Sequence, residues 1–177
     1  MYQVAPGGIL FLDLSKSGTG WAAGSDLTRC PAWGVWKFSG LLGPVFGGLE
    51  NELADAIAEM KPRLVGMEAP LAANQQTDAH SAEILIGLAA IAEATCWRWD
   101  VPLTRHSSGT LRSQVCGRAH RTDEERHAKQ NVKDLIVKPW VESMGWDIPD
   151  HNARDACVGL AYLLGYRFPR AGKKVAA

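Results

Sequence analysis

Apolar residues occur along this chain in two patterns, short unbroken runs and longer stretches with helical spacing. The first run, Ile9–Asp13, ends in an acid, and an unbroken run of this length predicts a buried strand. Turn residues follow it, and residues 21–23 and 34–38 then have the pattern of two returning strands. We therefore expect an antiparallel meander of three strands at the beginning of the chain.

Helical and strand patterns alternate after the meander. The apolar residues between Pro44 and Pro62 share one helical face, and Leu64–Glu68 is again an apolar run. The elements expected beyond it, in chain order, are an alanine-rich helix at 79–97, a strand at 100–104, a helix through 111–115 capped by Ser107 or Ser108, a helix from a capping box of Thr122 and Glu125 to about Trp140, and a last helix capped by Asp150 or Asn152. A meander followed by βα units predicts an α/β protein with a mixed sheet and helices on both faces.

Composition narrows the class of protein. The 177 residues, 46% of them apolar and 21% charged, fit one globular domain, which we place at 1–168, with a basic tail at 169–177 expected to be disordered. The formal net charge is zero, so attraction for nucleic acid must come from local clusters such as the basic stretch 105–138. The four cysteines form no CxxC pair, and neither a signal pattern nor an apolar run of membrane-spanning length is present. We expect free thiols, no membrane association and a cytoplasmic protein.

Three acidic residues carry the candidate chemistry. Asp13 and Glu68 each end an apolar run, and Asp155 lies near the start of the last apolar helix. If the second run lies parallel beside the first, both strand-end acids project from the same edge, and the last helix can bring Asp155 to them. Clustered carboxylates repel one another unless a cation holds them, and oxygen ligands suit Mg²⁺ or Mn²⁺. Two of the acids taken alone also have a structural explanation, as a turn former for Asp13 and a helix-dipole acid for Asp155, whereas Glu68, between a buried strand and Ala-Pro, has few structural reasons.

The residues around these acids resemble the motifs of the RuvC-type Holliday junction resolvases. The first run with Thr19-Gly20-Trp21-Ala22 behind it resembles the first motif of that family, and the run ending at Glu68 resembles the second. Asp155-Ala156, at the head of a helix of small residues, resembles the last. The resemblance extends over about 8–165 and implies a ribonuclease H-like fold; the short length and divergent loops resemble a phage or organellar branch.

The chain departs from the family pattern at two places. Leu14-Ser15 follows the first acid, where the family often has Pro-Gly. Asn152 stands three residues before Asp155, where many members have an acid or a histidine, whereas others place the fourth group four residues before, which is His151 here. Both positions can share a helical face with Asp155, and we expect His151 to be the fourth ligand, with Asp150 as the helix cap.

The resemblance implies a structure-specific endonuclease that resolves four-way DNA junctions by paired symmetric nicks. Two Mg²⁺ ions, for which Mn²⁺ would substitute, would bind between Asp13, Glu68 and Asp155, with Asp13 bridging them and His151 completing one shell or assisting proton transfer. No small-molecule cofactor is expected. Two nicks on opposed strands need two active sites, so we expect a symmetric homodimer, for which the small-residue helix 79–94 offers a contact surface if it does not simply cover the sheet.

Contacts with DNA are expected from the basic stretch and from the loop that follows Glu68. The implied wedge into the branch point is Leu71, and the residues expected to contact phosphates are Arg112, Arg118, Arg121, Lys129 and Lys133. Acids interleave with these bases, so an ordinary solvated helix explains the same pattern. The host compartment implied is the cytoplasm of a bacterial or phage-infected cell, or an organelle.

Other functions fit the same residues. A nuclease of this fold acting on RNA–DNA hybrids or flaps would use the same acids, and a non-catalytic nucleic-acid-binding protein would keep the fold without cutting. An ATPase of the actin-like superfamily shares a glycine-rich first hairpin, but this chain is too short for the two lobes of that architecture.

Overall fold

Five strands form one mixed sheet in the order β3-β2-β1-β4-β5. In this computed structural model, which describes residues 6–16, 18–70, 79–127 and 131–169, the strands are β1 (Ile9–Asp13), β2 (Thr19–Gly24), β3 (Ala32–Trp36), β4 (Leu64–Glu68) and β5 (Leu103–His106). β1 pairs antiparallel with β2, and β2 with β3, while β4 lies parallel to both β1 and β5. The predicted meander with parallel strands beside it is therefore confirmed.

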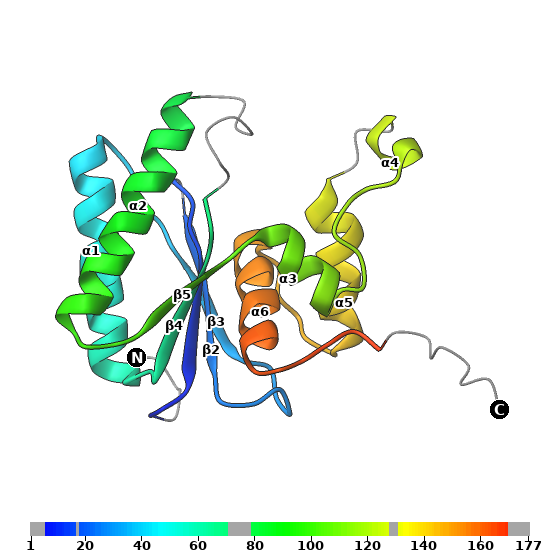
Figure 1. The fold of residues 1–177 in the computed structure, drawn as a ribbon, viewed down its shortest axis with the longest axis horizontal. Coiled ribbons are helices and arrows are strands. Elements are labelled where there is room, and N and C mark those ends of the chain that lie inside the picture. Colours follow the sequence, from blue (N-terminus) through cyan, green and yellow to red (C-terminus); the bar gives the residue numbers. More distant parts are fainter. Residues whose placement is uncertain (1–5, 17, 71–78, 128–130, 170–177) are drawn as a thin grey trace.

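Helices cover the two faces of the sheet unequally (Figure 1). Two long helices, α1 (Leu42–Met60) and α2 (Ala79–Arg98), lie on one face. The other face is covered by α6 (His151–Leu163), which contacts β1 and β2. Against α6 pack α3 (Ser108–Val115), α5 (Lys138–Ser143) and the π-helical turn η2 (Lys133–Val137), and the short helix α4 (Asp123–His127) lies at the margin of the molecule.

The alternation of side chains along β1 divides the core into two parts. Leu10 and Leu12 are fully buried against α1 and α2, whereas Ile9 and Phe11 are buried against α6 and its neighbours. Successive side chains of a strand point to opposite faces, so Asp13 points to the same side as Phe11. The strand thereby directs its terminal acid toward α6.

Three predicted elements differ from the structure. The third strand of the meander, expected at 34–38, is β3 at Ala32–Trp36. The strand expected at 100–104 begins later, as β5 at Leu103–His106. The single helix expected from Thr122 to about Trp140 is wrong, because α4 ends at His127 and a new helical segment starts after Asn131. The Asn131 Oδ1 accepts a hydrogen bond from the backbone N–H of Lys133 at 2.9 Å, which caps the new start, while the capping box of Thr122 and Glu125 forms as predicted.

The long helix α2 is a core element. By length and composition alone it is apolar enough to cross a membrane, but a core helix has the same properties, and seven of its residues are buried in the structure. A Cβ at Gly87 would lie 2.6 Å from the ring of Phe46 on α1. Gly87 therefore lets α1 and α2 of the same chain approach closely.

Candidate metal centre

The ends of β1 and β4 bring two acids to one edge of the sheet. The last pair in the parallel register is Leu12 with Met67, and Asp13 and Glu68 are the next residue on each strand. Asp13 is buried, with 7% of its surface exposed, and Glu68 is half-buried. A small hollow of about 110 Å³ lies beside them, lined by both acids together with the residues Leu14, Ala69, Pro70 and Leu85.

Helix α6 delivers the third acid because two glycines let it approach the sheet closely. A Cβ on Gly20 of β2 would lie only 2.7 Å from the backbone nitrogen of Ala153, and one on Gly159 would collide with the ring of Phe11. The helix begins at Asp150, whose side chain caps the N–H groups of the first turn, as one reading of the sequence predicted. Its first turns therefore sit directly over β1 and β2, and Asp155 is 5% exposed.

Burial and mutual repulsion raise the pKa values of two of the three carboxyl groups, Asp13 and Glu68. Burial first, and then the charge of Asp155, raise the pKa of Asp13 well above its ordinary value, and the lowering effect of Lys133 offsets only part of this. Burial and the charge of Asp155 also raise the pKa of Glu68, against the lowering effect of Arg112. Such mutual repulsion of buried acids is what a bound cation relieves.

Two basic side chains already lie among these acids. The Lys133 Nζ is 2.6 Å from Asp155 Oδ2, 3.2 Å from Asp13 Oδ2 and 3.1 Å from Asn152 Oδ1. Burial lowers the pKa of Lys133, but the two carboxylates outweigh it and raise it overall. Arg112 of α3 places Nη2 3.8 Å from Asp155 Oδ1, and its side chain is only 13% exposed. Both residues were expected on a DNA-facing surface, and the structure places both inside the acidic centre.

The donor set fits a hard divalent ion, although no cage for one is preformed. Among the described residues, no group of three histidine, cysteine or acidic side chains is arranged to hold one ion. Asp155 Oδ2 is buried, and the Lys133 Nζ lies 2.6 Å from it, so a cation already stands beside this oxygen. Carboxylate oxygens with spare lone pairs, aimed at one edge, are the ligands that Mg²⁺ and Mn²⁺ prefer. We conclude that Asp13, Glu68 and Asp155 are the candidate ligands.

The structure separates the two candidates for the fourth group. His151 is exposed, on the first residue of α6, whereas Asn152 is buried at 9% exposure. The Asn152 Nδ2 donates to the carbonyl of Gly18 at 2.8 Å, which turns its Oδ1 toward Lys133. The amide three residues before Asp155 therefore faces the acids, and the expected preference for His151 has no support from its position.

The remaining residues expected to contact DNA lie outside this centre. Arg118 makes a bidentate contact with Glu125 at 2.9 and 3.0 Å and donates to the carbonyl of Leu135. Arg121 is half-buried on the same loop. Leu71 and Lys129 lie outside the described residues. The role of these side chains in DNA binding stays a prediction.

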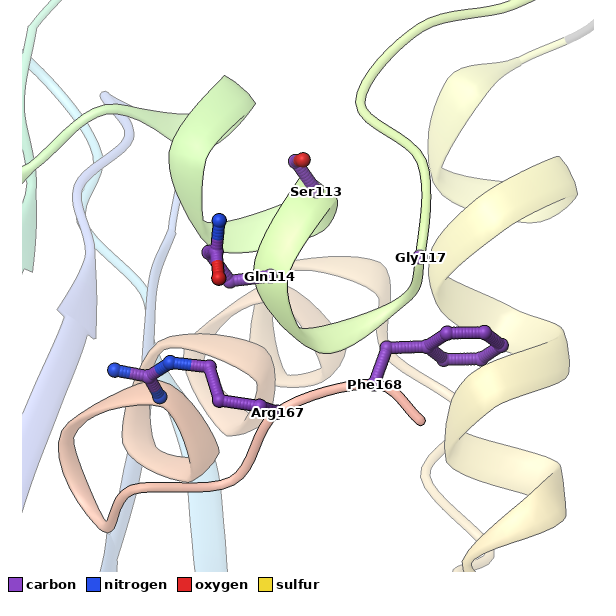
Figure 2. A pocket seen from close by; sticks show the side chains of 5 residues that line it. All are labelled: Ser113, Gln114, Gly117, Arg167 and Phe168. Atoms are coloured by element: carbon purple, nitrogen blue, oxygen red, sulfur yellow. The ribbon is translucent and has the colours of Figure 1, made fainter. Parts of the chain in front are cut away.

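A second hollow lies away from the acids, between α3 and the segment that follows α6 (Figure 2). Its one charged side chain, Arg167, donates to the carbonyls of Tyr162 and Tyr166 and stacks on the Tyr162 ring. In Figure 2 the ring of Phe168 points beneath Gly117, away from Arg167. With its only charge engaged, this hollow offers no chemistry that competes with the acidic centre.

Comparison of the whole structure with solved structures identifies the fold. RuvC of Thermus thermophilus in complex with a Holliday junction substrate superimposes with a TM-score of 0.67 and 14% sequence identity, over 89% of this chain and 93% of that one. The chain has a RuvC-type fold. A second structure of the Thermus thermophilus protein gives a TM-score of 0.63 at 14% identity, with the same coverage. The yeast mitochondrial Holliday junction resolvase Ydc2 gives 0.58 at 12% identity, over 91% of this chain and 79% of that one.

The RuvC-type fold confirms the ribonuclease H-like sheet that the three sequence motifs implied. No protein-family model matches the chain, and no curated protein matches it by sequence. The likeness therefore resides in the three-dimensional arrangement, with little left in the sequence beyond the motifs. The ion pair of Lys133 with Asp13 had no signal in the sequence, because the two residues are 120 positions apart.

Proposed function

We propose that this protein is a metal-dependent endonuclease that resolves four-way DNA junctions. The observation that carries the proposal is the meeting of three buried or half-buried acids, Asp13, Glu68 and Asp155, at one sheet edge of a RuvC-type fold. Support comes from the related structures, one of which was solved with a Holliday junction substrate while another is a mitochondrial junction resolvase. Fold alone does not establish function, and the acids supply the chemical reason.

Each residue of the centre has a defined part in this proposal. Asp13, Glu68 and Asp155 would hold Mg²⁺ or Mn²⁺, which supplies charge stabilisation for the scissile phosphate and a water of lowered pKa. Asp13, at the end of the central strand, interacts electrostatically with both of the other acids. Asn152 holds Lys133 through its Oδ1, and Arg112 holds Asp155 from the side of α3. These contacts fix the rotamers of the acids before any substrate arrives.

A symmetric dimer would provide the two centres that paired nicks require. An apolar stripe runs along the exposed side of α2, where Ile86 is 52% and Trp97 is 82% exposed. Two exposed alanines at helical spacing lie between them, so the stripe consists of Ile86, Ala90, Ala94 and Trp97, with the ion pair of Glu93 and Arg105 at its side. An exposed stripe of this kind on a core helix supports association of two chains through α2.

The decisive experiment is cleavage of a labelled four-way DNA junction, compared with duplex, flap and RNA–DNA hybrid, in Mg²⁺ and in EDTA. We expect paired symmetric nicks in the junction alone, with none in EDTA. Asp13→Asn should bind the junction without cutting it. The matched control is Asp55→Asn, the same chemical change at an exposed residue of α1 on the other side of the sheet, and it should cut normally.

Each alternative has its own outcome in this experiment. Cleavage of the hybrid or flap instead of the junction would keep the metal centre and replace the substrate. If wild type and both variants bind the junction and none of them cuts any substrate in Mg²⁺, or in Mn²⁺ in its place, the result would favour a non-catalytic binding protein. Normal cleavage by Asp13→Asn would refute the assignment of the centre itself.

A further inference from the structure

Lys133 is in direct contact with two of the acidic residues of the centre. Its ammonium contacts oxygens of three residues, Asp13, Asp155 and Asn152, at 2.6 to 3.2 Å, and its side chain is 23% exposed. Lys133 is the first residue of η2, and the buried side chains of Ile136 and Val137 anchor that turn in the core. An ammonium held by three oxygens in this way occupies the position that a cation would take.

The neutral amide of Asn152 completes the set of oxygens around Lys133, and we call this part of the centre, between Asp13 and Asp155, the corner. Its Nδ2 is committed to the Gly18 carbonyl, so only Oδ1 faces the centre, and Oδ1 already accepts from Lys133. A second divalent ion at this corner would have to displace the ammonium and rely on an uncharged oxygen. Glu68 is different, because the ion pairs of Lys133 are with Asp13 and Asp155, and the hollow that Glu68 and Asp13 line has neither Lys133 nor Asn152 in its wall.

The formal charges favour a single ion. Three carboxylates facing Lys133 and Arg112 leave the centre with a charge of −1. One divalent ion brings the centre to +1, and one scissile phosphate then makes it neutral. Two divalent ions with the lysine retained would leave a net charge of +2 even with the phosphate in place. A buried site of low dielectric penalises such an excess of like charge.

We propose that the Lys133 ammonium replaces one of the two divalent ions, so that each chain binds one ion, on the side of Asp13 and Glu68. This inference rests on the proposed function in one respect, because the single bound ion would be the ion used for cleavage. One ion per chain replaces the two ions per active site that the sequence led us to expect. Lys133 is a positioning residue for Asp13 and Asp155, and its positive charge stands where a second metal ion would otherwise bind.

The test counts bound Mn²⁺ by electron paramagnetic resonance of the free ion, without DNA. Wild type should bind one ion per chain. Lys133→Gln should bind two, because removing the ammonium opens the corner between Asp13 and Asp155 and lowers the formal charge of the two-ion centre without DNA from +3 to +2. The matched control is Lys138→Gln. Lys138 lies five residues after Lys133, is exposed and pairs with Glu142, so its replacement removes the same charge and the variant should still bind one ion. Circular dichroism establishes that each variant is folded.

Several results would overturn the inference. Any stoichiometry other than one in wild type does so, and this measurement needs no variant. A folded Lys133→Gln that still binds one ion does so too, as does a second ion in Lys138→Gln. Because the ions are counted without DNA, the result is separate from cleavage. One ion in a protein that cuts no junction would refute the proposed function alone, and two ions in a protein that cuts would refute this inference alone.

Discussion

The approach of α6 to the sheet can be tested at Gly20, which lies in β2 under the first turn of the helix. A Cβ at this position would meet three backbone atoms, of which the nitrogen of Ala153 is 2.7 Å away and two atoms of Asn152 are closer. Gly20 has no positive φ, so alanine is allowed by the backbone and the effect of Gly20→Ala is purely steric. Backbone atoms cannot rotate away, and the helix start must retreat.

The size of the retreat sets the size of the effect. Bringing the Ala153 nitrogen alone from 2.7 Å to an ordinary contact of 3.4 Å requires a shift of about 0.7 Å, and Asn152 requires more. Overpacking of this kind costs about 3 kcal/mol at the upper end of the usual range. For a chain of this length each kcal/mol corresponds to roughly 2–4 °C, so the melting temperature should fall by roughly 6–12 °C. A displacement near 1 Å at Asp155 should also slow junction cleavage about 100-fold.

Thermal unfolding and cleavage well below the melting temperature measure these effects separately. The control is Gly47→Ala in α1, where a Cβ would meet nothing within 4 Å, and it should leave cleavage unchanged and stabilise the helix by up to about 1 kcal/mol. If Gly20→Ala melts within about 1 °C of wild type and cuts at the same rate, the close approach of α6 to β2 is wrong.

Three further predictions concern the charges, a helix end and the proposed dimer. The pKa values of Asp13 and Glu68 are raised in the native state, which therefore binds more protons than the unfolded chain above the ordinary pKa values of 3.8 and 4.5. The free energy of unfolding in EDTA should consequently fall as the pH rises through the raised values. Mg²⁺ should then raise the melting temperature more at pH 8 than at pH 5, and an equal increase at both would contradict this. Lys61 ends α1 with a φ of 45°, a conformation that favours glycine, so Lys61→Gly should stabilise the protein by roughly 1 kcal/mol in urea unfolding, and a loss of stability would count against that strain. Ile86→Lys should shift sedimentation from dimer to monomer without lowering the melting temperature of the monomer, as should Trp97→Lys, whereas an unchanged dimer would exclude the α2 stripe.

The positions of Asp13 and Glu68 were predictable because local information determines them. Each acid ends an unbroken apolar run, and a right-handed crossover places two such strands parallel and adjacent. Alternation along the strand then decides the face to which each acid points. The motif glycine at position 20 was visible in the sequence as well, although its reason, the approach of the Asn152 backbone, appears only in three dimensions.

The choice between His151 and Asn152 could not be made from the sequence. Residues three and four positions before Asp155 both lie near its helical face, and the rotation of α6 about its own axis decides which one points inward. That rotation is set by contacts of Gly20 and Gly159 with distant parts of the chain. The outcome, with Asn152 inward and His151 exposed, depends on tertiary packing and has no local signal.

The two half-buried bases, Lys133 and Arg112, also bear on how the acidic centre would bind DNA under the proposed function. Three carboxylates without compensation would repel the phosphate on which the proposed reaction acts, and the net charge of the protein is zero, so no general field overcomes that repulsion. Lys133 and Arg112 reduce the formal charge of the centre to −1 while remaining largely shielded from solvent, where salt screens their effect only weakly. A centre so nearly neutral needs little more than one divalent ion to become attractive to a phosphate. The same lysine that limits the number of ions therefore also lowers the barrier to approach by the substrate.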